Sequence, residues 1–295
     1  EIHMQHNKII CVDGLVFDRS PNIWYINWQS QSIQMPHFPV CNTTMSNNIE
    51  TLYFYGGNVF TSFQCQIFKT FPSLKYLEVR SSNLAEFPDL FNGSKVETIR
   101  LDSNKITILT GPTNIPTVNN LKQIRINHNV ITTLHASFFD HLTKLELVYL
   151  YNNQITSLPE GVFKYLFSVI HFEIYSNQVN TIANYTEMQT PNKLLELEMY
   201  YNSIKFFPES FLKNLTVLER MQMSHNDLTY IPDCFLNDAY KLKYMYLYNN
   251  DVSSIWSVSC IPGGNQLERI ELHHNQIEYL PDNFLANMTV LKYLI

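Results

Sequence analysis

The sequence predicts a curved solenoid, a horseshoe with a parallel β-sheet on its concave face and irregular or short helical segments on its convex side. The first observation is a repeated unit whose copies begin 22 to 26 residues apart. The second is a pattern, apolar-x-x-apolar-x-apolar-x-x-Asn-x-apolar, whose copies begin at Val96, Leu121, Leu145, Val169, Leu194, Leu218, Leu242 and Leu267. The third is an excess of asparagine, since 31 Asn exceed the 26 Asp and Glu together. One such unit cannot bury its own apolar face, so neighbouring units must stack.

Looser copies of the unit extend the repeat toward both ends of the chain. They begin at Ile23, Ile49 and Leu74, and a twelfth copy begins at Leu291 and stops after five residues. We therefore expect an N-terminal cap-like segment over residues 1–22 and a single repeat domain over residues 23–295, with about eleven repeats and the start of a twelfth. A repeat array without a capping segment leaves an apolar end open, so we expect this domain to be truncated at its C-terminus.

Each unit opens with a predicted strand of about four to five residues. Side chains alternate across a strand, so positions 4 and 6 of the unit, for example Val148 and Leu150, point into the core. Positions 5 and 7, for example Tyr149 and Tyr151, then point outward. Stacking the units pairs the strands into one parallel sheet, and apolar residues of the second half of each unit fill the core from the other side.

Asparagine at position 9 has a mechanical role. The chain leaves the strand there, and a short amide side chain can supply both a donor and an acceptor to backbone groups that lose their partners. We therefore expect a buried structural ladder formed by Asn104, Asn129, Asn153, Asn177, Asn202, Asn226, Asn250 and Asn275. An unpaired buried polar group costs about 1–3 kcal/mol, so these asparagines are expected to hold neighbouring units together rather than to catalyse a reaction.

These units resemble the leucine-rich repeat family over nearly the whole chain, from about Ile23 to Ile295. The second half of the unit is similar to the extracellular "typical" class of 24 residues, with an apolar-Pro pair followed by Phe at Leu158-Pro159 and Phe163, Phe207-Pro208 and Phe211, Ile231-Pro232 and Phe235, and Leu280-Pro281 and Phe284. Two departures are local: the first three units lack the ladder Asn, and Pro112 and Pro116 stand where a Phe half is expected. The class resembles Toll-type receptor ectodomains and secreted arthropod immune leucine-rich repeat proteins, which implies a recognition role.

Glycosylation sequons and cysteines favour an extracellular location. Asn-x-Ser/Thr occurs at Asn42, Asn92, Asn184, Asn214 and Asn287, always outside the strands and never at a ladder Asn. Cys234 and Cys260 occupy nearly matching places on adjacent units, which makes a disulfide between them geometrically reasonable. The resemblance implies a further disulfide in an N-terminal cap, and the sequence leaves all three pairings open among Cys11, Cys41 and Cys65.

Composition and missing motifs exclude several functions. A net charge of −6 and a pI near 5.9 offer no basic footprint for nucleic acid as the main partner. No apolar run reaches the roughly 18 residues that a membrane span needs. Nucleotide-binding, hydrolase and zinc-protease motifs are absent, and His128, His225 and His274 each precede a ladder Asn, which favours a structural role over a metal site. We expect no catalytic activity, no cofactor and no metal.

The outward strand positions form one continuous surface, and in a solenoid such a surface normally carries the function. Tyrosine recurs there, and we expect one patch of Tyr149, Tyr151, Tyr175, Tyr200 and Tyr201 and a second of Tyr244, Tyr246 and Tyr248. Tyrosine is enriched at protein-binding surfaces, although its strand propensity alone would also place it on a sheet. The candidate ligand-binding residues of the concave face are Tyr53, Tyr55, Arg100, Arg125, Tyr149, Tyr151, Tyr175, Glu173, Glu198, Tyr200, Tyr246 and Tyr248.

The leading interpretation is a non-enzymatic extracellular recognition module, secreted or at the cell surface. It would bind a protein or a microbial surface component through the concave face, in an innate immune or receptor-like role. One alternative is a structural or adhesive protein of the extracellular matrix or cell surface. Another is a carrier or inhibitor subunit of a secreted enzyme or hormone complex. The sequence leaves the ligand and the oligomeric state open.

Overall fold

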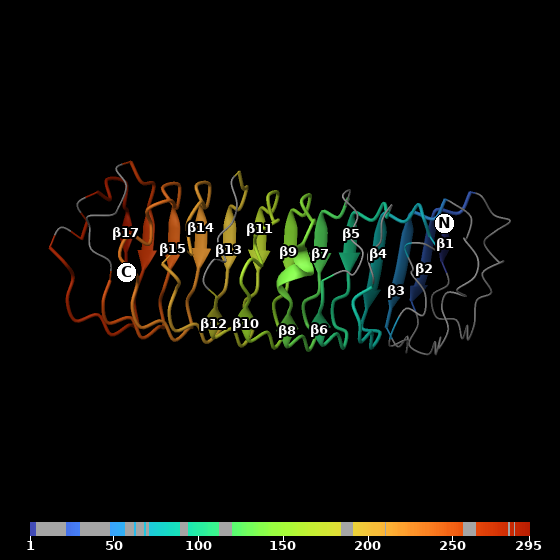
Figure 1. The fold of residues 1–295 in the computed structure, drawn as a ribbon, viewed down its shortest axis with the longest axis horizontal. Helices are drawn as coiled ribbons and strands as arrows, with labels where there is room; N and C mark the ends of the chain where they lie inside the picture. The colour runs from blue at the N-terminus through green and yellow to red at the C-terminus, as the bar shows by residue number, and fades with distance from the viewer. Residues whose placement is uncertain are drawn as a thin grey trace.

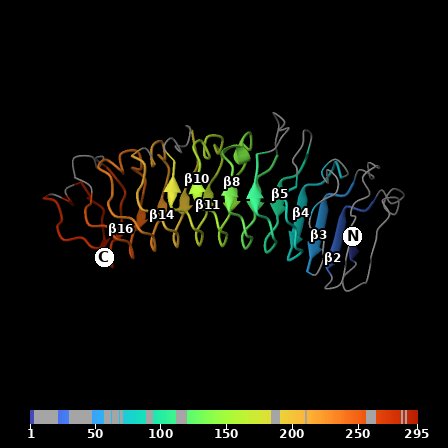
Figure 2. The same cartoon turned by 60° about the horizontal axis from the view of Figure 1, so that its bottom comes forward.

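The computed structural model describes most of the repeat region. The described residues are 1–3, 22–29, 48–56, 62, 68, 71–88, 94–111, 120–183, 191–209, 211–255, 264–282, 284–285 and 287–295. They form a long, gently curved stack of units with the two ends of the chain at opposite ends of the stack (Figures 1 and 2). The predicted solenoid is therefore confirmed.

One parallel sheet of 13 strands, here called the main sheet, runs along the whole stack (Figure 1). Its strands are, in spatial order, β1 (Ile2–His3), β2 (Tyr25–Gln29), β3 (Thr51–Tyr55), β4 (Tyr76–Arg80), β5 (Thr98–Arg100), β7 (Gln123–Arg125), β9 (Leu147–Tyr149), β11 (His171–Glu173), β13 (Glu196–Glu198), β14 (Arg220–Gln222), β15 (Tyr244–Tyr246), β16 (Arg269–Glu271) and β17 (Tyr293–Leu294). Each residue pairs with its counterpart one unit away: Phe172, for example, lies between Val148 and Leu197. The register therefore equals the sequence repeat.

Strands β5 to β16 of the main sheet have three residues, fewer than the sequence predicts. Hydrogen bonding nevertheless continues past the last strand residue: the Leu150 amide donates to the Glu173 carbonyl at 2.8 Å, and the Asn152 amide donates to the Tyr175 carbonyl at 3.1 Å. Position 7 of each unit therefore stays aligned with its neighbours, and the alternation of inward and outward side chains extends to it.

Two small parallel pairs lie along the lower margin of the stack in Figure 1, away from the main sheet. They are β6 (Ile108–Leu109) with β8 (Thr133–Leu134), and β10 (Ser157–Leu158) with β12 (Thr181–Ile182). One short 3-10 helix, η1 (Ala136–Phe139), is the helical element of the described region. The expected irregular or short helical convex side thus holds, with short strand pairs added.

The core lies between the main sheet and the second half of each unit. Its buried apolar side chains form one continuous cluster, to which Val148 and Leu150 contribute from the inward strand positions. Phenylalanines fill the other side: the Phe207 ring lies 5.1 Å from that of Phe211 and 4.8 Å from that of Phe235. Burial of these rings across unit boundaries is what makes each unit depend on its neighbours.

The position-9 asparagines lie buried or half-buried where the chain leaves the main sheet. Asn153 donates from Nδ2 to the carbonyls of Ile126 at 3.1 Å and Leu150 at 2.9 Å, and its Oδ1 accepts from the amide of Ile131 at 3.1 Å. Equivalent bonds are made by Asn104, Asn129, Asn177, Asn202, Asn226, Asn250 and Asn275. Each amide therefore bridges its own unit to the one before it, satisfying buried backbone groups.

Position 8, just before the ladder Asn, has a left-handed backbone. The φ angles are 51° at Ser81, 56° at Ser103, 55° at His128, 53° at Asn152, 53° at Ser176, 52° at Tyr201, 54° at His225, 52° at Asn249 and 55° at His274. Small or polar residues tolerate this region best, which accounts for the histidines there without any metal. Tyr201 is the bulky exception, and 52% of it is exposed.

Candidate binding face of the main sheet

The outward face of the main sheet is built from three rows of side chains. Each unit contributes positions 3, 5 and 7, which are the first and third residues of its three-residue strand and the residue two places later. Because units pair in register, residues at the same position lie side by side, about 4.8 Å apart along the stack. We call these the position-3, position-5 and position-7 rows.

Three tyrosines of the position-7 row stack on consecutive units. The Tyr151 and Tyr175 rings lie 4.5 Å apart with an interplanar angle of 4°, and the Tyr175 and Tyr200 rings lie 4.3 Å apart with an angle of 9°. Inter-strand spacing nearly equals the stacking distance of aromatic rings, so parallel register produces this arrangement directly. Burial and the neighbouring tyrosines raise the pKa of the Tyr175 hydroxyl, which keeps it protonated. We call Tyr151, Tyr175 and Tyr200 the tyrosine stack.

Aromatic contacts continue beyond the tyrosine stack through the neighbouring position-8 residues Tyr201 and His225. Tyr201 lies edge-on to Tyr200 at 5.6 Å and stacks on His225 at 4.1 Å. At the next position-7 place the small, buried Ser224 follows, so no ring continues the row there. His225 in turn lies edge-on to Tyr248 at 5.4 Å, and Tyr248 stacks on His273 at 4.6 Å and 7°. Tyr201 and His225 therefore link the tyrosine stack to Tyr248 of the second expected patch.

Arginines cover several tyrosines of the position-5 and position-3 rows. The guanidinium carbon of Arg125 lies 4.4 Å from the Tyr149 ring centre, that of Arg220 lies 4.7 Å from Tyr246, and that of Arg269 lies 4.9 Å from Tyr293. The ring faces of Tyr149 and Tyr246 thus make cation–π contacts with arginines. The tyrosine stack instead presents ring edges and hydroxyls. This difference was not visible in the sequence, because it depends on which rotamer each arginine adopts.

Glu173 and Glu198 are register neighbours in the position-5 row, beside the tyrosine stack. Burial, and then repulsion by Glu198, raises the pKa of the Glu173 carboxyl to about 7, although Arg125 acts in the opposite direction. Burial also raises the pKa of Glu198, but Nε of Arg220 lies 3.5 Å from its carboxylate and favours the charged form. Glu196 pairs with Nδ1 of His171 at 3.1 Å.

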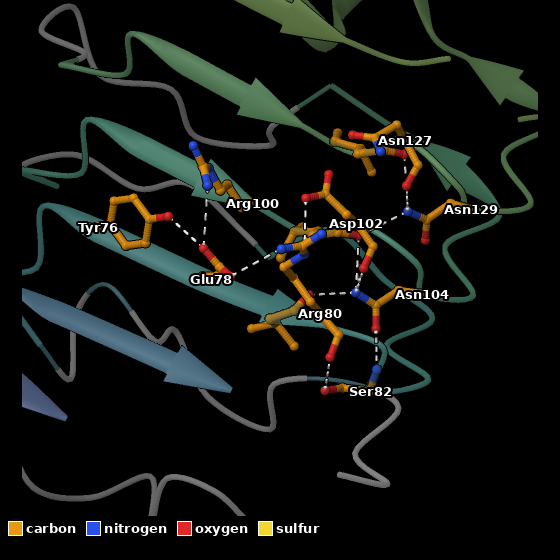
Figure 3. A network of polar contacts seen from close by, with 12 residues as sticks. Tyr76, Glu78, Arg80, Ser82, Arg100, Asp102, Asn104, Asn127 and Asn129 are labelled. Atoms are coloured by element: carbon orange, nitrogen blue, oxygen red, sulfur yellow. Dashed lines mark hydrogen bonds and ion pairs between the residues drawn. The ribbon is translucent and has the colours of Figure 1, made fainter. Parts of the chain in front are cut away.

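A polar network fills the outward face over β4 and β5 (Figure 3). Arg80 lies 3.7 Å from Glu78 and 3.3 Å from Asp102, and Arg100 lies 3.7 Å from Glu78. The Arg80 Nε to Asp102 contact is an ion pair without hydrogen-bond geometry, because that Nε has no hydrogen-bond acceptor. Asp102 is only 3% exposed, and its burial raises the carboxyl pKa despite the nearby arginines. The outward face over β4 and β5 is therefore an internally paired network, in which Arg100 is already engaged.

The N-terminal tyrosines lie apart from the tyrosine stack. Tyr53 packs between Tyr25 at 5.2 Å and Tyr76 at 5.1 Å. Tyr55 is 44% exposed, with the Arg80 guanidinium 6.0 Å from its ring. The network over β4 and β5, followed by β7, separates both from Tyr151. The candidate residues named from the sequence therefore do not form one continuous patch.

The margin where the strands begin changes beside the tyrosine stack. In eight other units position 2 carries Lys and Glu in cross-strand pairs, at 2.7 Å for Lys75 with Glu50, 2.8 Å for Lys122 with Glu97, 2.9 Å for Lys243 with Glu219 and 2.7 Å for Lys292 with Glu268. At β11 and β13 the same position carries Ile170 and Leu195. Leu147 adds an apolar residue on the outward face of β9. Sequence reasoning missed this apolar margin, although the break in alternating charges was readable.

Several expected residues lie outside the described region. These are the sequon asparagines Asn42, Asn92 and Asn184 and the cysteines Cys11, Cys41, Cys65 and Cys260. Cys234 is disulfide-bonded, and its pairing with Cys260 stays a prediction. Of the other sequons, Asn287 is exposed and Asn214 is half-buried. Across the described residues, no group of three His, Cys, Asp or Glu side chains is placed to hold a metal ion, and no helix has the length and apolar character of a membrane crossing.

Comparisons with known proteins agree on the architecture. The Leucine rich repeat family matches residues 94–155 and 119–179. A search of curated proteins found no match. Among solved structures, TLR13 in its complex with ssRNA13 has a TM-score of 0.64 at 17% identity, covering 92% of this chain and 43% of that one. Drosophila Toll in its complex with Spatzle has a TM-score of 0.64 at 19% identity, covering 99% and 43%.

A Leptospira interrogans leucine-rich repeat protein has a TM-score of 0.56 at 20% identity, with 98% of this chain and 82% of that chain covered. The chain thus spans less than half the length of the two Toll-type chains. At these identities the likeness is one of fold, so the functional argument must come from the residues.

Proposed function

The chain is a leucine-rich repeat protein, and we propose that it is a non-enzymatic extracellular recognition module that binds a protein ligand through the outward face of its main sheet. Proteins of this fold are typically binding modules, and Toll itself is a neighbour solved with Spatzle. The proposed role is receptor-like or innate immune. The outward face would be the concave face of the horseshoe.

The tyrosine stack is the observation that carries this proposal. Tyr151, Tyr175 and Tyr200 expose aromatic edges and hydroxyls on three consecutive units. Ile170 and Leu195 line the adjacent margin, while ion-paired networks lie on either side. A patch that is aromatic and apolar at its centre and charged at its rim is the usual anatomy of a protein interface.

Strand propensity explains the presence of tyrosines but not the change in their surroundings. If Tyr only covered the sheet, the Lys and Glu pairs of position 2 would have no reason to stop at β11 and β13. A second feature is Tyr201, a bulky and exposed residue at the edge of the same patch, whose left-handed backbone costs conformational energy. Both features favour a binding surface at the centre of the stack.

An extracellular location is supported by two features. Cys234 is disulfide-bonded, and disulfides are typical of oxidising compartments. Asn287 is an exposed sequon.

RNA is a less suitable ligand than protein, even though TLR13 is a neighbour solved with ssRNA13, because the net charge is −6 and Glu173 and Glu198 face the partner.

The test is quantitative capture from extracellular fluid by the purified glycosylated chain and by a Tyr151→Ala, Tyr175→Ala, Tyr200→Ala variant. The matched control is a triple alanine variant at the exposed Tyr230, Tyr240 and Tyr279, none of which belongs to the outward face. We expect the partner recovered by the wild type to be recovered by the control and lost from the stack variant. Equal recovery by all three proteins would mean that the tyrosine stack does not bind it.

A further inference from the structure

Two charged residues of the outward face lack a salt-bridge partner among the described residues. Among the described residues of the three rows from β3 to β16, Asp, Glu, Lys and Arg side chains lie within salt-bridge distance of an opposite charge or, for Glu196, of the His171 imidazole, with two exceptions, Arg125 and Glu173. The pairs that account for the others are Arg80 with Glu78 and Asp102, Arg100 with Glu78, His171 with Glu196, Arg220 with Glu198, and Arg269 with Glu271.

The two unpaired charges flank one tyrosine. Arg125, Tyr149 and Glu173 are register partners on the neighbouring strands β7, β9 and β11. Two inter-strand steps separate the backbone positions of Arg125 and Glu173 by about 10 Å. Arg125 lowers the pKa of the Glu173 carboxyl, but the two side chains form no salt bridge. The Arg125 guanidinium lies over the Tyr149 ring at 4.4 Å, and its buried Nε has no hydrogen-bond acceptor. The row therefore presents a cation that lies over an aromatic ring, followed by an anion on the next strand.

Folding does not require this arrangement. The equivalent place on β14 holds the neutral Gln222, which donates no charge to the row and whose Oε1 accepts from the Ser224 amide at 3.2 Å. Glu173 is instead half-buried next to Glu198, and both effects raise its pKa, which means that its charged form is disfavoured in the free protein. A partner cation would remove that penalty.

We propose that the partner presents an acidic side chain to Arg125 and a basic side chain to Glu173, less than about 10 Å apart. This deepens the proposed function and rests on it. The acidic group lies toward the N-terminal end of the stack and the basic group toward the C-terminal end. A partner turned end for end would bring like charges together, so the pair fixes orientation as well as affinity.

The probe for this proposal is a displayed library of random peptides, panned separately on the full wild-type chain and on two single charge reversals. Wild type is expected to enrich peptides with one acidic and one basic residue close to each other. Arg125→Glu is expected to enrich peptides with two basic residues, and Glu173→Lys those with two acidic residues. These expectations do not depend on the direction in which a peptide lies on the sheet.

A selected peptide then provides a charge-compensation test. Its affinity for Arg125→Glu is expected to be about tenfold weaker than for wild type, and to recover when its acidic residue is changed to Lys. Lys105→Glu is the matched control, because it makes the same change in net charge at an exposed residue outside the three rows. Circular dichroism of each variant confirms that it is folded.

Different failures identify different errors. If peptide binding requires the tyrosine stack but the enriched charges are the same for wild type and both reversals, the charge-pair inference is wrong and the proposed function stands. If selected peptides bind the Tyr151, Tyr175 and Tyr200 alanine variant as well as wild type, the proposed function is wrong. A library that yields no binder to the wild type contradicts both.

Discussion

Replacing Asn153 by Leu tests whether the asparagine ladder holds adjacent units together. The Asn153 amide donates to the carbonyls of Ile126 and Leu150 and accepts from the amide of Ile131. Its two carbonyl partners each keep one further donor, Asn129 and Asn177 respectively. The Ile131 amide has no such second partner, because Asn153 is its one acceptor among the described residues.

The expected cost follows from this difference. An orphaned buried donor costs about 1–3 kcal/mol, and each lost carbonyl bond costs about 0.5–1.5 kcal/mol. Asn153→Leu should therefore lower the free energy of unfolding by roughly 2–6 kcal/mol, even though Leu is the more apolar residue. The measurement is urea unfolding followed by circular dichroism and by tyrosine fluorescence.

Asn180→Leu is the matched control for this substitution. Asn180 is exposed in the same region, and its side chain only accepts a hydrogen bond from the hydroxyl of Thr181. The control should change stability by less than about 0.5 kcal/mol. If Asn153→Leu were as stable as Asn180→Leu, the bonds of the ladder would not be what couples one unit to the next.

Three further predictions concern the core, the turn and the acidic row. Phe172→Ala should lower the free energy of unfolding by about 3–5 kcal/mol in the same urea assay, because the ring is fully buried between β9 and β13; a loss below 1 kcal/mol would contradict the described packing. His128→Val should cost about 1–2 kcal/mol, because a β-branched residue is strained at a φ of 55°, whereas His128→Asn should be neutral. A raised folded pKa favours the protonated form, so Glu173 contributes stability below about pH 4.5 that is lost as the pH rises through about 7. Glu173→Gln should therefore be more stable than wild type above pH 7, by about 1–2 kcal/mol after solvent screening, and not below pH 4.5; a constant difference across this range would contradict it.

Periodicity made the fold and the place of the outward face predictable. The spacing of Leu, Asn and Phe determines which residues are buried, and strict register then brings Tyr151, Tyr175 and Tyr200 side by side. Position 8 was also readable in principle, because Gly, Ser, His and Asn recur where the backbone is left-handed. Tyr201 hides that signal, since its bulk is atypical of the conformation.

Charge pairing could not be predicted from the sequence. Arg100 and Arg125 occupy the same position of adjacent units and look equivalent in the sequence, yet Arg100 is ion-paired with Glu78 while Arg125 lies over Tyr149. Long flexible side chains choose among several partners within reach, and periodicity carries no information about that choice. The three-residue strands and the small strand pairs were missed for a related reason, because strand ends depend on local hydrogen bonding rather than on apolar spacing.

Because the strand register equals the sequence repeat, equivalent residues of two units are separated by a whole number of inter-strand steps. Deleting residues 145–168 would remove one complete unit and join β7 to β11 without disturbing the phase of the remaining ones. Arg125 would then stand beside Glu173, one strand away instead of two, and the two could neutralise each other. Loss of one unit would thus keep the phase of the repeat but erase the proposed charge readout, so recognition by spacing depends on the number of units as well as on residue identity.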